Sequence, residues 1–268
     1  MNHPPQAASC ALLSGAVPTD SMAAPWLPRT VPCGTILCVG LVLAGDPQHW
    51  CAAASPYAAP DELERASRFI HTIDAARHLA GRALVRKVLA AATGVSFPAT
   101  PFSRNAWGKP ELPGSPVSFS ISHAGTMLWT AFCRHTPVGI DVEAIPSATD
   151  VFELARMLHS DECAEIAALS QHEAVACFYR TWVRKEAVLK AVGEGLNRSL
   201  TSFRVSTGAA SGNWLQQPPG GEGYASPGWT TADIAVREGY FCSVAAQASG
   251  LSLAVHHVPC PDAALFFA

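Results

Sequence analysis

Hydrophobic and polar residues alternate with two different periods along this chain, and each period predicts one type of secondary structure. Residues 36–43 form a short apolar run, which predicts a strand. In 138–143, valine and isoleucine alternate with polar residues, the two-residue period of a strand. In 74–94 the apolar residues fall on one face of a helix. The chain therefore mixes helices and strands.

Residues that begin or end elements complete the prediction. Asp61 and Glu62 follow a proline, which is typical of a helix start because acidic side chains suit the positive end of the helix dipole. Gly193 ends a long helix, and Glu238-Gly239 between two apolar runs indicates a hairpin. The predicted helices cover 60–69, 74–94, 151–158 and 172–192, with one more starting at 160; the predicted strands cover 36–43, 117–121, 127–133, 138–143, 234–236 and 240–245.

The order of these elements indicates an α+β protein of two similar lobes, each pairing a helix with strands. The length of 268 residues leaves room for one to two domains. We expect a flexible N-terminal tail over 1–30, an N-terminal lobe over 31–136, a C-terminal lobe over 137–260 and a C-terminal tail over 261–268. The Gly-, Pro- and Ser-rich segment 209–228 is expected to be an exposed insertion.

Composition narrows the classes of function. A hydrophobic fraction of 49% excludes a mainly disordered chain, and a net charge of -3 disfavours a protein that coats nucleic acid. Nine cysteines without a Cys-x-x-Cys pair indicate reduced thiols rather than a zinc ribbon. The apolar stretch 35–45 is too short to span a bilayer. We expect a cytoplasmic protein with neither nucleic acid nor a membrane as its partner.

Two carboxylates share one face of the predicted strand 138–143. Asp141 and Glu143 are two residues apart, so their side chains point the same way. Two such charges at about 4 Å repel by about 4 kcal/mol at an effective dielectric constant of about 20. A divalent cation removes this repulsion, and Mg²⁺ prefers carboxylate, phosphate and water oxygens. The pair is either a magnesium site or an ordinary solvated strand face.

A second polar group lies on the predicted helix 172–192. Trp182, Glu186 and Lys190 are spaced by four residues and share one face. A glutamate four residues before a lysine is also a common pair on helix surfaces. As a third carboxylate, Glu186 would complete a metal site with Asp141 and Glu143.

Small polar residues after strand 117–121 form a third group. Ser122 and His123 are expected in a turn whose backbone amides can hold phosphate oxygens, with the imidazole as a further donor. Lys109, in a Gly-Lys-Pro loop, is another candidate phosphate partner. The alternatives are a structural histidine at a strand end and an ordinary exposed lysine.

Together these groups resemble the Sfp-type 4′-phosphopantetheinyl transferases in order and spacing. The shared pattern is Gly-Lys-Pro, Phe-Ser-Ile-Ser-His, Val-Gly-Ile-Asp-Val-Glu and Trp-x-x-Lys-Glu-Ala-x-x-Lys, within 61–200. The resemblance implies a monomeric, Mg²⁺-dependent enzyme with its active site between two similar lobes. Such an enzyme moves 4′-phosphopantetheine from coenzyme A to a serine of an apo acyl or peptidyl carrier protein, and releases adenosine 3′,5′-bisphosphate.

The resemblance also implies the residues of the site. Asp141, Glu143 and Glu186 would hold Mg²⁺ against the pyrophosphate of coenzyme A. The residues that would contact coenzyme A itself are Arg65, Arg77, Lys109, Ser122, His123 and Lys190, with Arg65 and Arg77 at its 3′-phosphate.

The transfer itself needs a base for the carrier serine and stabilisation of the leaving group. Glu186 is the candidate base, Lys190 the candidate partner of the leaving oxygen, and His123 a third candidate catalytic residue. An acidic carrier would be attracted by positive charge and would dock a helix on apolar residues. The candidates for these contacts are Arg180, Arg184 and Lys185, and the apolar residues of 152–158.

Two other classes of function stay open. One is a module that binds coenzyme A or a carrier without catalysis, against which the presence of three carboxylates and Lys190 argues. The other is a metal-dependent phosphohydrolase, which would call for an Asp/His cluster of the two-metal type that we do not find in the sequence.

Overall fold

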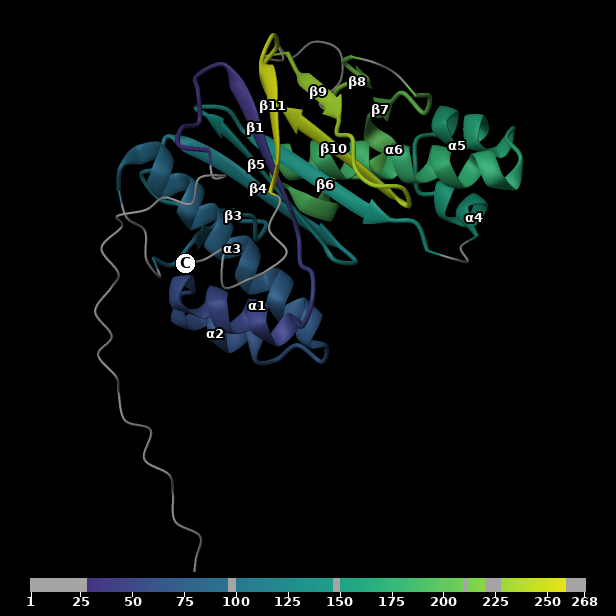
Figure 1. Ribbon diagram of the computed structural model, residues 1–268. Helices are drawn as coiled ribbons and strands as arrows, with labels where there is room; N and C mark the ends of the chain where they lie inside the picture. Colours follow the sequence, from purple (N-terminus) through teal and green to yellow (C-terminus); the bar gives the residue numbers. More distant parts are fainter. Residues whose placement is uncertain (1–27, 96–99, 147–149, 210–211, 220–227, 259–268) are drawn as a thin grey trace, which may run out of the picture.

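The computed structural model of the protein describes residues 28–95, 100–146, 150–209, 212–219 and 228–258 (Figure 1). It confirms a mixed α+β fold. The predicted C-terminal tail 261–268, nearly all of the N-terminal tail and part of the segment 209–228 lie outside the described residues.

A four-stranded sheet forms one half of the fold, in the order β11-β1-β5-β4. Its strands are β1 (Thr35–Val42), β4 (Val117–Ala124), β5 (Met127–Arg134) and β11 (Ser252–Val258). The helices beside it are α1 (Pro47–Ala54), α2 (Pro60–Ala66) and α3 (Thr72–Thr93), and the short strands β2 (Ser103–Arg104) and β3 (Pro110–Glu111) form a separate ribbon. Leu37, Val39 and Leu41 of β1 pack against Leu84 and Val88 of α3 in one core.

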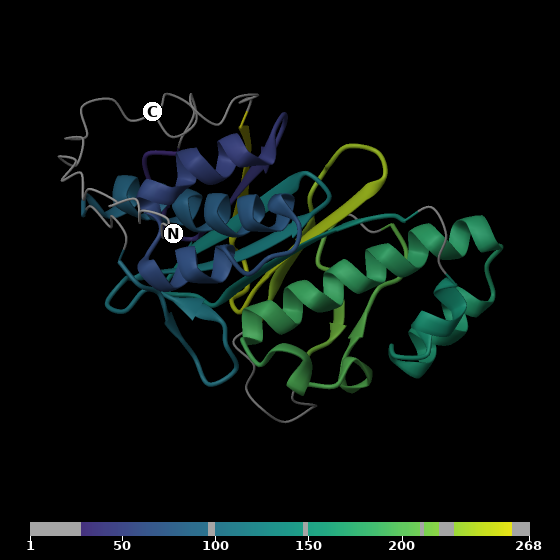
Figure 2. The same ribbon diagram turned by 90° about the horizontal axis from the view of Figure 1, so that it is seen from below.

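A three-stranded sheet of order β6-β10-β9 forms the other half. Its strands are β6 (Val138–Ala144), β9 (Thr230–Asp233) and β10 (Tyr240–Ala246). The long helix α6 (Gln171–Val192) lies along this sheet (Figure 2), and α4 (Val151–Ala155), α5 (Ser160–Ala167), β7 (Arg204–Val205) and β8 (Leu215–Gln217) complete this part. Ser170 caps the start of α6, and Gly193, with a φ of 81°, ends it as predicted.

The inner faces of the two sheets share one hydrophobic core. It contains Ile36 and Trp129 from the first sheet and Ile140 and Val244 from the second. Beside it, β4 and β6 are joined by side chains: Ser120 Oγ accepts a hydrogen bond from the Ile140 amide at 3.2 Å, which holds the sheets together at this edge.

Several predicted elements differ from the structure. β11 and α1 were not predicted. Most residues of β11 are exposed, so it shows no clear alternation, whereas the Asp46-Pro47 start of α1 is a signal that was overlooked. The first strand of the predicted hairpin 234–236 is wrong, because the strand is β9 and Ile234 follows it. An exposed insertion is wrong for Trp214, which is 1% exposed and packs in the core.

β11 also shows how the chain is distributed between the sheets. It runs parallel to β1 and pairs with it from Thr35↔Ser252 to Leu41↔Val258. The end of the described chain therefore returns to the first sheet.

Candidate active site

The site begins where α6 lies directly on β6, and Gly139 makes this approach possible. A Cβ atom at Gly139 would lie 2.1 Å from the Ala187 carbonyl oxygen and 2.3 Å from the Ala191 amide nitrogen. With no side chain there, the carboxylates that follow on β6 face the helix turn that carries Glu186 and Lys190.

Asp141 is the most buried of the three predicted carboxylates, at 2% exposure. Its Oδ1 accepts hydrogen bonds from Lys190 Nζ at 2.6 Å and from Ser122 Oγ at 2.8 Å. Lys190 Nζ also donates to Ser122 Oγ at 2.9 Å, and the Val142 amide donates to the same hydroxyl at 3.3 Å. A single cluster thus joins β4, β6 and α6.

Glu143 and Glu186 are coupled to Asp141, and we call Asp141, Glu143, Glu186 and Lys190 the acidic cluster. Burial, followed by the charges of Asp141 and Glu186, raises the pKa of Glu143 to about 7, while Lys190 and a hydrogen bond from Trp182 oppose the rise. Burial and the charge of Asp141 also raise the pKa of Glu186. The charge of Asp141 therefore disfavours the ionisation of both glutamates, and the charge of Glu186 adds to this effect on Glu143, as expected for closely grouped acids.

The donor set fits a magnesium ion, although the ligands are not preassembled. Asp141 Oδ2 is buried and has no hydrogen-bond partner among the described residues, so it is an acceptor in need of a donor or a cation. Carboxylate oxygens are the ligands that Mg²⁺ prefers. Within the described ranges, however, no three His, Cys, Asp or Glu side chains are arranged closely enough to hold a metal. Lys190 supplies the charge that neutralises Asp141.

His123 and Ser122 lie in β4 itself, so the prediction that they form a turn after the strand is wrong. β4 continues to Ala124, and His123 pairs with Leu128 of β5. Ser122 is buried, and its hydroxyl bonds to Asp141 and Lys190. His123 is exposed, and its pKa is lowered by desolvation and by the charges of Arg77 and Lys190. A phosphate at His123 would reverse this shift.

Lys109 connects the loop between β2 and β3 to both elements of the acidic cluster. Its Nζ donates to the carbonyl oxygens of Val138 at 3.1 Å and Ala191 at 3.5 Å. Burial lowers its pKa to about 8. Asn105 Nδ2 donates to the Gly193 carbonyl oxygen at 2.8 Å, so the whole loop is attached to the end of α6.

Arg65 and Arg77 lie on different helices and have different surroundings. Arg65 is exposed on α2. Arg77 Nε donates to the Gly125 carbonyl oxygen at 2.7 Å, and Arg77 Nη1 donates to Asp74 Oδ1 at 2.6 Å. Arg77 thus bonds to the turn between β4 and β5.

A basic cluster of His78, Arg82 and Arg104, beside Arg65, was missed by the sequence prediction. Burial, then the charges of Arg82, Arg65, Arg104 and His123, lower the pKa of His78 to about 3. Its Nε2 is buried without a hydrogen-bond partner among the described residues. His78 and Arg82 are four residues apart on the predicted helix 74–94, a spacing that would have indicated a shared face. His123 is coupled electrostatically to both groups, because Lys190 lowers the pKa of His123 and His123 lowers the pKa of His78.

Two of the basic residues expected to attract a carrier are internal, so that prediction is wrong for them. Arg184 and Lys185 are both 0% exposed. Arg184 pairs with Asp233, and Lys185 Nζ lies 2.8 Å from Glu162 Oε2. Arg180 is partly exposed and donates to the Thr207 carbonyl oxygen at 3.1 Å.

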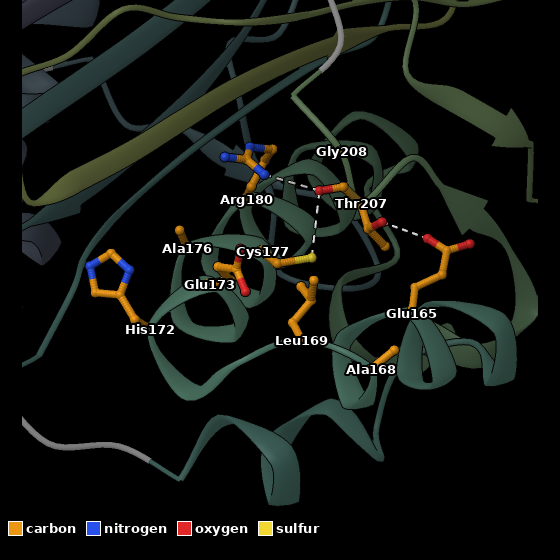
Figure 3. Close-up of a pocket in the computed structure, with 10 residues that line it drawn as sticks. All are labelled: Glu165, Ala168, Leu169, His172, Glu173, Ala176, Cys177, Arg180, Thr207 and Gly208. Atoms are coloured by element: carbon orange, nitrogen blue, oxygen red, sulfur yellow. Dashed lines mark hydrogen bonds between the residues drawn. The ribbon is translucent and has the colours of Figure 1, made fainter.

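A groove of about 630 Å³ lies between α5, the first half of α6 and residues 207–208 (Figure 3). Its lining includes Glu165, Leu169, His172 and Cys177. Of the residues expected to contact substrate or carrier, it contains Arg180, and it contains none of the acidic cluster.

Sequence comparisons identify the family. Residues 137–245 match the family described as the 4′-phosphopantetheinyl transferase superfamily, and residues 45–134 match the family described as 4′-phosphopantetheinyl transferase, N-terminal. The first match contains the acidic cluster, and the second contains the basic cluster. The chain belongs to the 4′-phosphopantetheinyl transferase superfamily, and its resemblance to the Sfp type is confirmed.

Individual relatives support this assignment. The chain is 34% identical over 151 residues to the 4′-phosphopantetheinyl transferase Sfp of Bacillus subtilis (strain 168), covering 56% of this chain and 66% of the relative. It is 33% identical over 164 residues to a 4′-phosphopantetheinyl transferase of Bacillus subtilis, covering 60% and 70%. It is 30% identical over 178 residues to the L-aminoadipate-semialdehyde dehydrogenase-phosphopantetheinyl transferase of Xenopus laevis, covering 59% of each. The aligned part therefore spans about two thirds or less of most of these relatives.

Two general expectations can be compared with the described residues. Seven cysteines there, Cys33, Cys38, Cys51, Cys133, Cys163, Cys177 and Cys242, are free thiols. None of the helices described has the length and apolar character needed to cross a bilayer.

Proposed function

We propose that this protein transfers 4′-phosphopantetheine from coenzyme A to a serine of an apo carrier protein, with adenosine 3′,5′-bisphosphate as the other product. The observation that carries the proposal is the cluster of Asp141, Glu143, Glu186 and Lys190 at the contact of β6 with α6, inside the region that matches the family. The basic cluster around His78 lies within the other matched region.

The acidic cluster would receive the pyrophosphate of coenzyme A together with Mg²⁺. Asp141, Glu143 and Glu186 are the residues that would hold the ion, which when bound would neutralise charge on the pyrophosphate. Lys190 already lies 2.6 Å from Asp141 Oδ1 with its side chain 29% exposed, so its ammonium is available to a phosphate oxygen at the same place.

Glu186 suits the role of general base. Its pKa is raised by burial and by Asp141, and a carboxylate with a raised pKa binds a proton more readily near neutral pH. It would accept the proton of the carrier serine as the serine oxygen attacks the phosphorus bearing the pantetheine arm. Lys190 would stabilise the negative charge on the departing phosphate oxygen.

The basic residues suit the adenosine end of coenzyme A. Besides burial, the charges of Arg65 and Arg104 lower the pKa values of both His78 and Arg82, although Glu62 raises that of Arg82, and a phosphate would offset this repulsion. His123 is coupled electrostatically both to His78 and to Lys190. We also propose that the two halves are the similar lobes expected from the sequence, with the active site between them in a monomeric cytoplasmic enzyme.

Intact-mass spectrometry of an apo carrier protein tests the transfer. The carrier, incubated with wild-type protein, coenzyme A and Mg²⁺, is expected to gain the mass of one phosphopantetheine group. Glu186→Gln should abolish this gain, because the amide cannot accept the serine proton, while far-UV circular dichroism stays unchanged. The matched control is Glu153→Gln, an exposed residue of α4, which should retain transfer.

Each other outcome would contradict a specific part of the proposal. Binding of coenzyme A without any mass gain, across several acyl and peptidyl carriers, would favour a binding module. Release of adenosine 3′,5′-bisphosphate with an unmodified carrier would favour hydrolysis. Wild-type transfer by Glu186→Gln would remove Glu186 from the base role.

A further inference from the structure

The turn between β4 and β5 is held from α3 by an arginine. We call Gly125 and Thr126 the β4–β5 tip. Arg77 donates through Nε to the Gly125 carbonyl oxygen at 2.7 Å and also through Nη2 to the same oxygen. Asp74 Oδ1 accepts from Arg77 Nη1 at 2.6 Å and fixes the guanidinium plane. Both nitrogens that face the tip are therefore committed to one backbone carbonyl.

The same tip is held on its other side by Tyr240 of β10 and by Arg237 of the loop before β10. A Cβ atom at Gly125 would lie 2.2 Å from Tyr240 Oη, so the tyrosine hydroxyl packs directly on this glycine. Arg237 Nη2 donates to Tyr240 Oη at 2.8 Å and to Thr126 Oγ1 at 3.0 Å. Its guanidinium carbon also lies 4.6 Å from the centre of the Tyr240 ring.

The tip is close in sequence to the residues that join the two clusters. His123 lies two residues before Gly125 in β4, and Ser122 precedes it. Ser122 Oγ in turn contacts both Asp141 and Lys190. A shift of the tip would therefore move the imidazole relative to the basic cluster and displace the hydroxyl from the acidic cluster.

We propose that Arg77 and Tyr240 are positioning residues that fix the β4–β5 tip from opposite halves of the protein and thereby place His123 for coenzyme A. The inference rests on the proposed function, and it differs from the expectation that Arg77 binds the 3′-phosphate directly. Tyr240 carries no charge for a phosphate, yet it contacts the same tip. Loss of either residue should have the same effect on coenzyme A binding.

Tyr240→Phe is the most selective variant, because it removes one hydroxyl and no charge. Its first measurement is the NMR signal of the His123 imidazole in the protein alone, assigned with His123→Gln; the signal should move. Its second is calorimetry with coenzyme A, where affinity should fall about five-fold, the equivalent of one lost hydrogen bond. A merely structural role would lower the melting temperature without moving either readout.

Arg77→Lys separates positioning from direct phosphate binding. Lysine keeps the positive charge but loses the paired donors to the Gly125 carbonyl, so affinity for coenzyme A should fall as in Tyr240→Phe. Because both residues act through one tip, the double variant should be little weaker than either single one. If the loss of coenzyme A affinity in the double variant equals the product of the two single losses, the proposal is overturned. Wild-type affinity in Arg77→Lys would overturn it as well.

Glycine variants test the tip itself. Gly125→Ala places a methyl group against Tyr240 Oη and should move the His123 signal. Gly250→Ala is its control, because Gly250 also has a positive φ, 74° against 55°, but has nothing within 4 Å of the added atom. An unmoved His123 signal in both Gly125→Ala and Tyr240→Phe would refute the positioning role. This readout needs neither carrier nor coenzyme A, so it is independent of whether the wild-type protein carries out transfer.

Discussion

Glu143→Gln should stabilise the protein in the absence of metal, which is unusual for a change in an active site. The pKa of Glu143 is raised from its ordinary value of 4.5 to about 7 by burial and by Asp141 and Glu186. At about 1.4 kcal/mol per pKa unit, ionised Glu143 lowers the free energy of unfolding by about 3 kcal/mol at most, since the carboxylate is only partly buried. A neutral glutamine removes this penalty.

The effect depends on pH in a defined direction. The folded protein binds the proton of Glu143 more tightly than the unfolded chain does. The stabilisation that comes from protonated Glu143 is therefore fully present below pH 4.5 and is lost as the pH rises through about 7. Wild type and Glu143→Gln should therefore have similar stability near the lower value. The variant should be the more stable of the two above the higher value.

Urea unfolding at a series of pH values, with metal removed by chelation, measures this difference. Glu238→Gln, an exposed residue of the turn before β10, is the control and should show no such divergence. Added Mg²⁺ should stabilise the wild type more than Glu143→Gln, because the ion favours the ionised carboxylate. A variant less stable than wild type above pH 7, or an equal response to Mg²⁺, would refute this account of the cluster.

Three further predictions follow from single contacts. Gly139→Ala forces a methyl group onto the backbone of α6 and should lower the free energy of unfolding by about 3 kcal/mol in chemical unfolding, with loss of transfer. The control Gly81→Ala meets a side-chain methyl of Ile121 at 3.1 Å and should lower the free energy of unfolding by less. An equal destabilisation by the two variants would contradict the close approach of α6 to β6. Lys185→Met leaves Glu162 buried without its partner and should reduce the free energy of unfolding by about 3–5 kcal/mol; Glu162→Gln in the same chain should recover part of the loss, and full additivity would count against the pair. Coenzyme A should bind more tightly as the pH falls toward the pKa of His123 in the free protein, which lies below 6.5, because phosphate favours the protonated imidazole. Calorimetry of His123→Gln should show a shallower pH dependence of the affinity. An unchanged pH dependence would exclude the His123 imidazole as its source.

Much of the fold follows from local patterns in the sequence. The stripe of apolar residues in α3, its end at Gly94, and the alternation in β6 all depend on neighbouring residues, and the structure confirms them. β11 depends on a pairing with β1 more than 200 residues away, as in Thr35↔Ser252, and its own exposed side chains carry no alternation. Such a strand is specified by its partner.

In the candidate site, too, the features that follow from local sequence were predicted, and those that depend on distant residues were not. The motif order placed Asp141, Glu186 and Lys190 on elements that the structure brings together. Burial was not readable: Arg184 and Lys185 resemble surface charges, but each pairs with a carboxylate supplied by another element. The contacts of Arg77 and Tyr240 were likewise hidden, because they meet at Gly125 from opposite ends of the chain.

We expect the three acidic side chains of this site to converge on one cation. A crystal structure with coenzyme A and Mn²⁺, in which anomalous scattering locates the ion, measures this directly. One strong anomalous peak should lie among Asp141, Glu143 and Glu186, beside the pyrophosphate. A peak on other residues, or coenzyme A bound with no ion among these carboxylates, would contradict it.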